Sequence, residues 1–143
     1  MVEGSDSFAA RQRAFEQVPI HRALGLELLE SSPGAARVRM VASPLTIGGV
    51  GGSVHGGLLA CLVDVAMLQA IIPALDPATD EPAGTADLNI TYLRPALGKH
   101  VVAEARVLRK GRQLAVVEVE ITDDAGRLCA KGRTIYALRA RGR

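Results

Sequence analysis

Aromatic residues are scarce in this sequence: tryptophan is absent, and aromatic residues of all kinds account for 3% of the 143 positions. The formal net charge at pH 7 is only +2. Proteins that bind nucleic acid usually combine a strongly basic surface with aromatic side chains on which bases stack. Neither feature is present, so we do not expect nucleic acid to be a partner.

Cysteine is almost as rare, with only Cys61 and Cys129, and the two do not form a CxxC pair. Two cysteines and three histidines at these spacings do not make a metal site, so we expect no bound metal. Residues 1–13 are polar and lack the apolar core of a signal peptide. We therefore expect a cytoplasmic protein with free thiols.

Only one long hydrophobic run is present, at residues 57–72. A helix that spans a membrane needs about 20 apolar residues. This run has 16, carries Asp64 in its middle and stops at Pro73. It predicts a buried core helix, and we expect no association with a membrane.

The rest of the chain alternates between strand-like runs and turns rich in glycine and proline. Residues 73–84 have the composition of a turn-rich connector. The pattern predicts a short helix at 7–17 and strands at 24–31, 35–42, 85–92, 100–110, 113–123 and 127–139. This order predicts an α+β fold in which a six-stranded, mostly antiparallel sheet wraps around one long central helix. We divide the chain into an N-terminal extension (1–19), one domain (20–139) and a short tail (140–143).

Residues 85–92 give the clearest strand signal. Apolar residues at the even positions, from Ala86 to Tyr92, alternate without a break with polar residues at the odd positions, from Thr85 to Thr91. Such alternation is typical of a strand with one buried and one exposed face. The central helix is apolar almost all round, so it must be enclosed on nearly every side. One sheet can cover most of it, and a second copy of the protein can cover the rest.

The central helix begins directly after a glycine-rich turn, GSVHGG, at residues 52–57. The first amides of a helix have no acceptor within the helix, so those near Gly56 and Gly57 favour negative charge. A helix start of this kind can polarise a carbonyl group and hold an oxyanion. The same glycines also suit a simple tight turn. From the glycines alone, both interpretations stay open.

Asp64 is the one carboxylate in this apolar helix. The residues that share its helical face cannot pair a charge: they are Gly57, Ala60, Cys61, Leu68 and Ile71. A buried charge is costly unless it is paired or hydrogen-bonded. Either donors from elsewhere in the chain satisfy this carboxylate, or Asp64 serves as a general base or nucleophile.

The spacing of these groups predicts how a site would be assembled. Gly57 and Asp64 lie seven residues apart, which is roughly 10.5 Å along a helix. A reacting carbonyl carbon must lie within about 3–3.5 Å of the attacking atom. One helix therefore cannot bring both groups to the same carbon, whereas two antiparallel copies can. If the protein is an enzyme, the sequence predicts a homodimer with two shared sites.

Three features together resemble a known family: the HGG motif at 55–57, a carboxylate nine positions after its histidine, and the strand TADLNITYLRP at 85–95. From Leu24 to Leu138 the chain resembles the hotdog-fold acyl-CoA thioesterases, most closely the phenylacetate-pathway and 4-hydroxybenzoyl-CoA type. The resemblance implies a hotdog thioesterase domain that hydrolyses an acyl-CoA or aryl-CoA thioester to the free acid and coenzyme A, without a cofactor. We expect the homodimers to pair into a homotetramer, whose arrangement the sequence leaves open.

The resemblance also implies roles for individual residues. Asp64 matches the catalytic carboxylate, which activates water or attacks the thioester directly. The Gly56 amide matches the donor that polarises the thioester carbonyl. Thr85 matches a small or hydroxyl residue near the attacking water, and His55 is expected to fix the turn before the helix.

Substrate contacts are expected at the helix start, at the end of the strand 85–92 and at a basic turn. The matching positions are His55, Gly57, Tyr92, Leu93, Arg94, Arg109, Lys110, Gly111 and Arg112. A basic turn at 109–112 suits the nucleotide phosphates of coenzyme A, and a solvated hairpin fits its composition equally well. One candidate position departs from the family pattern. Gly49 lies six residues before the HGG histidine, where many relatives have Asn or Gln to help hold the carbonyl or the water.

Other functions fit parts of this pattern. Gly49 suggests a non-catalytic protein of the same fold that binds or senses acyl-CoA. A hydratase or dehydratase would need a carboxylate and a histidine placed together, but His55 is on the far side of the turn from Asp64. A Cys61–His55 nucleophile is disfavoured as well, because six residues along a helix rotate one about 240° from the other.

Overall fold

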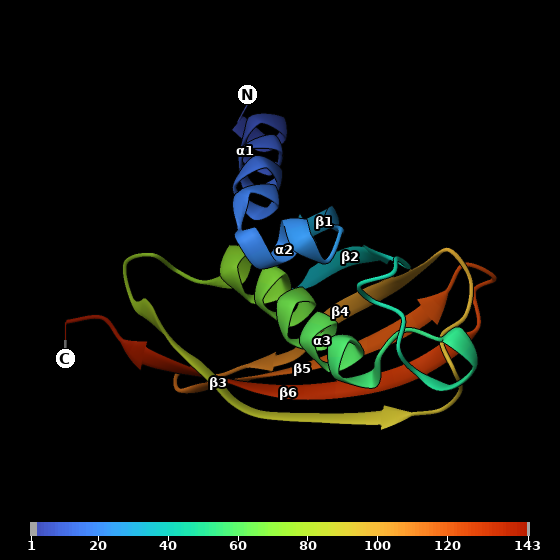
Figure 1. Ribbon diagram of the computed structural model, residues 1–143. Coiled ribbons are helices and arrows are strands. Elements are labelled where there is room, and N and C mark those ends of the chain that lie inside the picture. Colours follow the sequence, from blue (N-terminus) through green and yellow to red (C-terminus); the bar gives the residue numbers. More distant parts are fainter. Residues whose placement is uncertain (1–2, 143) are drawn as a thin grey trace.

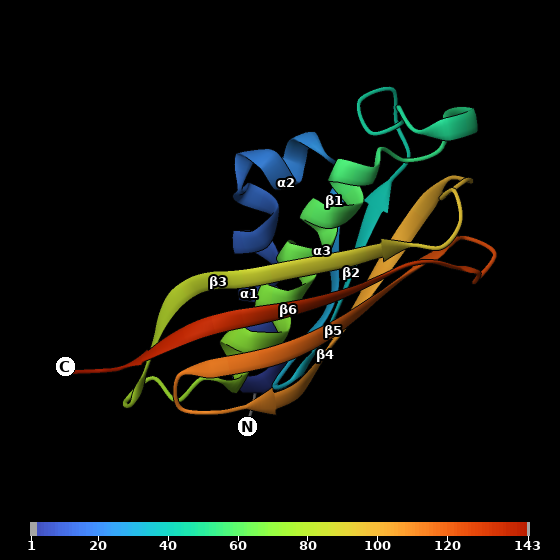
Figure 2. The same ribbon diagram turned by 90° about the horizontal axis from the view of Figure 1, so that it is seen from below.

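The computed structural model describes the backbone of residues 3–142 and the side chains of residues 8–142. Its helices are α1 (Glu3–Gln17), α2 (Pro19–Ala23) and α3 (Gly56–Ile71), with short 3-10 turns η1 (Val50–Gly52) and η2 (Ile72–Ala74). Its strands are β1 (Leu26–Ser32), β2 (Ala35–Val41), β3 (Asp80–Tyr92), β4 (His100–Lys110), β5 (Leu114–Asp123) and β6 (Leu128–Ala140). They form one six-stranded antiparallel sheet in the order β1-β2-β4-β5-β6-β3, with α3 along one face (Figure 1, Figure 2). This arrangement confirms the predicted α+β hotdog fold.

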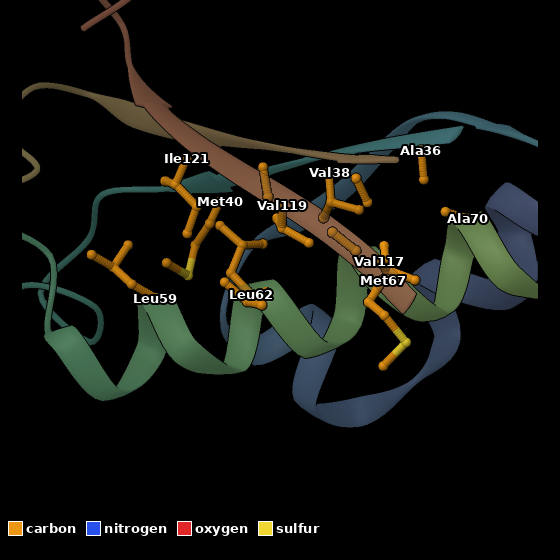
Figure 3. Close-up of a cluster of buried hydrophobic side chains, with 14 of the residues drawn as sticks. Ala36, Val38, Met40, Leu59, Leu62, Met67, Ala70, Val117, Val119 and Ile121 are labelled. Atoms are coloured by element: carbon orange, nitrogen blue, oxygen red, sulfur yellow. The ribbon is translucent and has the colours of Figure 1, made fainter. Parts of the chain in front are cut away.

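One side of α3 packs against the sheet and forms the core (Figure 3). The helix contributes the buried residues Leu59, Leu62, Val63, Ala66, Met67, Ala70 and Ile71. The facing strands β2 and β5 contribute Val38, Met40, Val117, Val119 and Ile121, among others. Burial of apolar surface, at about 25 cal/mol per Å², is the main force that holds helix and sheet together. By length and composition alone the segment Gly56–Ala74 could cross a membrane, and packing on the sheet buries one side of it.

Gly132 of β6 lies directly against α3. A Cβ atom at this position would stand 2.7 Å from Val63 Cγ1, well inside van der Waals contact. A glycine here therefore allows the helix to approach the strand closely.

The two edge strands of the sheet, β1 and β3, differ in whether another part of the chain covers their unpaired side. At the β1 edge, α1 donates side-chain hydrogen bonds from Arg11 Nη2 to Ser31 O (2.6 Å) and from Gln12 Nε2 to Leu28 O (2.9 Å). These bonds occupy carbonyl groups that an edge strand would otherwise offer to another strand. At the opposite edge, β3 pairs with β6 alone among the described residues, and most of its side chains are exposed.

The structure of β3 corrects two predictions. The strand begins at Asp80, so residues 80–84 of the predicted connector belong to the sheet. The predicted unbroken alternation is wrong, because the pairing with β6 shifts between Thr85 and Asp87. The extra residue, Ala86, forms a β-bulge, a feature common in edge strands. As a result Thr85 contacts α3 and Leu88 packs on the core, although one is an odd position and the other an even one.

The other elements lie close to their predicted positions. The central helix begins and ends one residue earlier than predicted, and each of the five remaining strands lies within two residues of its predicted limits. The N-terminal helix is longer than predicted, since α1 begins at Glu3 rather than at residue 7. It packs on the sheet through the buried side chain of Phe15.

Candidate active site

The first turn of α3 leaves one backbone amide available. The first four or so backbone amides of a helix have no acceptor further back in the helix. The residue that caps the helix can pair some of them. His55 is that cap: its Nδ1 accepts from the Gly57 amide at 3.0 Å. Its carbonyl oxygen accepts from the amides of Leu58 and Leu59 at 2.9 and 3.1 Å. Within residues 3–142 the Gly56 amide has no acceptor, so it is the donor that α3 can offer to a bound oxygen.

Tyr92, at the end of β3, holds this helix start. Its hydroxyl donates to the Gly56 carbonyl oxygen at 2.6 Å. The tyrosine ring also lies against Gly56, because a Cβ atom at Gly56 would stand 3.3 Å from the ring carbon Cζ. The tyrosine therefore fixes the backbone next to the free amide, and glycine allows this close contact.

A hollow of about 430 Å³ opens beside the Gly56 amide. The glycine-rich loop, the first turn of α3 and the segment after β3 all contribute to it. Its lining includes Gly49, Ser53, Gly56, Tyr92, Leu93 and Arg94. The Val54 amide donates to the Ala96 carbonyl oxygen at 3.0 Å and so ties the loop to the segment after β3. Five of the predicted site residues thus meet in one place, and Ser53 joins them although the sequence pattern did not single it out.

Asp64 lies in the middle of α3 and is half-buried. The Thr85 hydroxyl donates to Asp64 Oδ1 at 2.8 Å. This is a hydroxyl donor from elsewhere in the chain, and it serves one of the two carboxylate oxygens. Among the described residues Oδ2 has no donor, so it is available to a water molecule or a substrate. The sequence-based pair of Asp64 and Thr85 is therefore brought together.

Two other titratable groups lie near this carboxylate. Burial raises the pKa of the Cys61 thiol, and the negative charge of Asp64 raises it further. Burial also raises the pKa of the Tyr136 hydroxyl, again with a contribution from Asp64. Both groups stay protonated at neutral pH, which argues against Cys61 as a nucleophile. Tyr136 is a neighbour that the sequence pattern did not identify; inward-facing alternation along β6 is the only signal for it.

Within one protomer the amide and the carboxylate are too far apart to act together. Gly56 and Asp64 are separated by eight residues of the same helix, which is about 12 Å along its axis. Asp64 does not line the hollow that contains Gly56. A single copy therefore presents the two halves of a site in two different places.

The basic turn at 109–112 is also remote from the hollow. It lies beside the start of β3, where Lys110 Nζ pairs with Asp80 Oδ2 at 2.8 Å and lowers the pKa of that carboxyl. Tyr92 lies at the other end of this 13-residue strand, roughly 40 Å away at about 3.3 Å per residue. The two segments predicted to contact coenzyme A are not brought together in one protomer.

The side chains of this turn differ in how they are held. The Gly111 amide donates to the Leu114 carbonyl oxygen at 2.8 Å and closes the turn. Arg109 and Arg112 are exposed, and Arg112 lines a second, open hollow of about 700 Å³ together with Gln113 and Arg139. The turn thus offers guanidinium groups to an anion, next to the start of β3.

Comparison with known proteins identifies the family. Residues 51–130 match the model of the thioesterase superfamily. The chain is 37% identical over 126 residues to human acyl-coenzyme A thioesterase 13, covering 86% of this chain and 84% of that protein. It is 29% identical over 133 residues to the medium/long-chain acyl-CoA thioesterase YigI of Salmonella typhimurium, covering 85% and 86%. The crystal structure of zebra fish thioesterase superfamily member 2 superposes with a TM-score of 0.74 at 31% identity, covering 92% of this chain and 96% of that one. The fold, the helix start and these relatives agree: the chain belongs to the thioesterase superfamily.

Proposed function

We propose that the protein hydrolyses acyl-CoA or aryl-CoA thioesters to the free acid and coenzyme A at two sites shared by two protomers. In each site Asp64 of one protomer faces the Gly56 amide of the partner subunit. The observation that carries the proposal is the pair of groups left available on α3, one amide at its start and one carboxylate oxygen eight residues later. Thioester hydrolysis needs these two kinds of group, an oxyanion donor and a base that activates water.

The reaction follows from these positions. The thioester carbonyl oxygen accepts a hydrogen bond from the Gly56 amide, which makes the carbonyl carbon more electrophilic. Asp64 accepts a proton from water, and the water oxygen attacks that carbon to give a tetrahedral intermediate. The carbon–sulfur bond then breaks, and the proton passes to the coenzyme A thiolate. If Asp64 instead attacks the carbonyl carbon directly, the carbon–sulfur bond breaks, the coenzyme A thiolate leaves and an anhydride forms; water then opens the anhydride to the free acid and the Asp64 carboxylate, and the released proton passes to the thiolate, so the same two groups are needed.

Two features of the sheet and helix support a dimer. The β1 edge is occupied by α1, whereas β3 is left with one unpaired side. The face of α3 that carries Asp64 is only partly covered: Ala60, Cys61 and Leu68 on this face are half-buried, whereas Ile71 at its end is buried. A second copy that pairs along β3 would cover this face and place two α3 helices antiparallel.

The same antiparallel pairing would bring together two pairs of groups that lie far apart within one protomer. It brings the start of one helix towards the middle of the other, so that the Gly56 amide and Asp64 can reach one carbonyl. It also brings the start of β3 in one copy next to the end of β3 in the other. The guanidinium groups of the turn 109–112 would then lie near the hollow beside Arg94, where the phosphates of coenzyme A need cations.

The same proposal covers the substrate range, the oligomeric state, the cellular location, the cofactors and the partners of the protein. We propose aryl-CoA thioesters of the phenylacetyl and 4-hydroxybenzoyl type as substrates beside fatty acyl-CoA, assembly of dimers into tetramers, and a cytoplasmic location. We propose no metal or other cofactor and neither nucleic acid nor a membrane as partner. In the described part of the chain both cysteines are free, and no three His, Cys, Asp or Glu side chains cluster as metal ligands would.

Gly49 supports a second candidate, a protein that binds acyl-CoA without cleaving it. The position has no side chain, so it cannot supply the amide group that many thioesterases place there. Loss of one oxyanion donor usually costs about 10²–10³ in rate, which weakens catalysis without abolishing it. Hydrolysis therefore remains the function that the site supports best.

The test is hydrolysis of a panel of phenylacetyl-, 4-hydroxybenzoyl-, medium-chain and long-chain acyl-CoA, followed by release of the coenzyme A thiol. Wild type is expected to cleave at least one of these, and Asp64→Asn to lower kcat by about 10²–10⁴. Glu16→Gln is the control, because it likewise turns a carboxylate into an amide, at an exposed position of α1 that is remote from β3. Equally slow turnover by wild type and Asp64→Asn, with coenzyme A esters still bound, would identify a binding protein instead.

A further inference from the structure

Ser53 lies three residues before the start of α3 and is almost completely buried, with 4% of its surface exposed. Its backbone is well held: the Ser53 carbonyl oxygen accepts from the amides of Gly48 and Gly49 at 3.1 and 2.9 Å. Its amide donates to the Val50 carbonyl oxygen at 3.2 Å. Its hydroxyl, by contrast, has no hydrogen-bond partner among the described residues. The hydroxyl oxygen is not among the described buried side-chain atoms that lack a partner, so it is accessible from the hollow that Ser53 lines, where a bound oxygen can accept its hydrogen bond.

The Ser53 hydroxyl belongs to the same hollow as the start of α3. Ser53 and Gly56 line the same hollow, and each offers a donor that has no acceptor in the protein. A carbonyl oxygen has two lone pairs and can accept two hydrogen bonds, and a developing oxyanion favours two donors even more strongly.

The Ser53 hydroxyl also occupies the space that a side chain at position 49 would need. A Cβ atom at Gly49 would overlap Ser53 Oγ and would stand 3.0 Å from the Val54 carbonyl oxygen. The backbone angles of Gly49 (φ −86°, ψ −175°) are open to any residue, so space excludes a side chain there and backbone strain does not. In this chain the loop closes over Gly49 in a way that brings the serine hydroxyl to the hollow.

We propose that Ser53 Oγ donates the second hydrogen bond to the thioester carbonyl oxygen, beside the Gly56 amide. Ser53 is then a catalytic residue that supplies, from the other side of the loop, the donor that Gly49 cannot provide. It forms no covalent bond and transfers no proton, and it stabilises the negative charge that develops on the carbonyl oxygen. This inference rests on the proposed thioesterase function.

Steady-state kinetics of Ser53→Ala and Ser53→Thr on the best substrate of the panel test the inference. Ser53→Ala removes the donor and is expected to lower kcat by about 10²–10³ with a small change in KM. Ser53→Thr keeps a hydroxyl and is expected to retain most of the activity. Thermal unfolding of both variants identifies any loss that comes from misfolding. A folded Ser53→Ala enzyme with wild-type kcat overturns the inference, even while Asp64→Asn is inactive and the proposed function stands.

Binding of two unreactive analogues separates the inference from the proposed function. One is a coenzyme A ketone, in which a methylene group separates sulfur from the carbonyl, and the other is a thioether that has no carbonyl. Ser53→Ala is expected to weaken binding of the ketone at least about fivefold and to leave binding of the thioether unchanged, since one hydrogen bond is lost. Equal effects on both analogues, or none on either, overturn the inference. This measurement needs no turnover, so it decides the role of Ser53 even if wild type hydrolyses nothing.

A swap of the donor between positions 53 and 49 gives a third test. In Gly49→Asn combined with Ser53→Ala, the overlapping Oγ atom is gone and an amide side chain is available at position 49. The double variant is expected to bind the ketone more tightly than Ser53→Ala alone. If it binds the ketone no better than a Gly49→Ala, Ser53→Ala control of the same backbone, the two positions do not serve the same oxygen and the inference fails.

Discussion

Thr85 Oγ1 donates a hydrogen bond to Asp64 Oδ1 at 2.8 Å and so connects edge strand β3 to the central helix. The bond depends on the bulge at Ala86, which allows Thr85 to contact α3 although it lies three residues before Leu88. A threonine in a regularly alternating strand would point away from the helix at this position. The irregularity of the strand is therefore what positions the carboxylate.

Removal of this bond is expected to impair the reaction. Thr85→Ala leaves Asp64 free to rotate, and we expect kcat to fall about tenfold, since a hydrogen bond to a charged group contributes about 1.5–3 kcal/mol and this one is partly exposed. Thr85→Ser keeps the hydroxyl and is expected to stay within about twofold of wild type. Steady-state kinetics on one substrate measure both. Similar activity in Thr85→Ala and Thr85→Ser would show that the bond does not position Asp64.

The close contact between β6 and α3 predicts a sensitive position in the core. In Gly132→Ala the new methyl group meets Val63, and we expect the free energy of unfolding to fall by about 1–3 kcal/mol, as in other overpacked cores. Urea denaturation measures the change.

A double variant identifies the cause. Val63→Ala removes both methyl groups that the new Cβ would meet, so Gly132→Ala should cost less in that background than in wild type. Equal costs in the two backgrounds would mean that the contact with Val63 is not what requires glycine.

Asp123 predicts a specific dependence of stability on pH. The Arg127 amide, the Arg127 side chain and the Ala125 amide all donate to its carboxylate, at 2.9, 2.9 and 3.0 Å, and they lower its pKa below the ordinary 3.8. A lowered folded-state pKa stabilises the fold at pH values above 3.8, and this stabilisation is lost as the pH falls through the folded-state pKa.

Asp123→Asn is therefore expected to unfold at a lower urea concentration than wild type at neutral pH. The gap between the two midpoints should stay constant above about pH 5 and shrink as the pH falls below about 4. A gap that does not change between neutral and acid pH would contradict the assigned role of the carboxylate.

Much of the fold could be predicted because it follows from local pattern. The apolar run ending at Pro73 and the alternating strands define the helix and the sheet, and the HGG motif marks the helix start. The bulge at Ala86 could not be predicted, because an extra residue in one strand is defined by its partner, β6. The hydrogen bonds from Arg11 and Gln12 to β1 likewise depend on how distant segments pack.

Most residues of the candidate site could be predicted from the sequence. Their arrangement in space could be predicted only in part. Spacing alone indicates that Asp64 and the helix start cannot meet within one chain, and the structure keeps them eight residues apart on one helix. It does not indicate that the turn 109–112 lies at the opposite end of β3 from Tyr92, since that follows from strand order. Ser53 was missed because a small polar residue in a glycine-rich loop is ordinary, and only its place in the folded loop, lining the same hollow as Gly56, distinguishes it.

The central claim, that each site takes Asp64 from one protomer and the Gly56 amide from the other, can be tested by complementation. Gly56→Pro removes the amide at a first helical position, and His55 already has the extended ψ of 129° that precedes proline. Gly56→Ala is its control, because it adds the same Cβ against Tyr92 and keeps the amide. Asp64→Asn and Gly56→Pro chains are co-expressed with different tags and purified through both, so that each purified assembly contains both chains. In each mixed dimer one shared site holds both defects and the other is intact, so we predict activity well above that of the two nearly inactive parents, up to about half of wild type. A mixed dimer as inactive as its parents, or failure of the two chains to associate, would contradict the account.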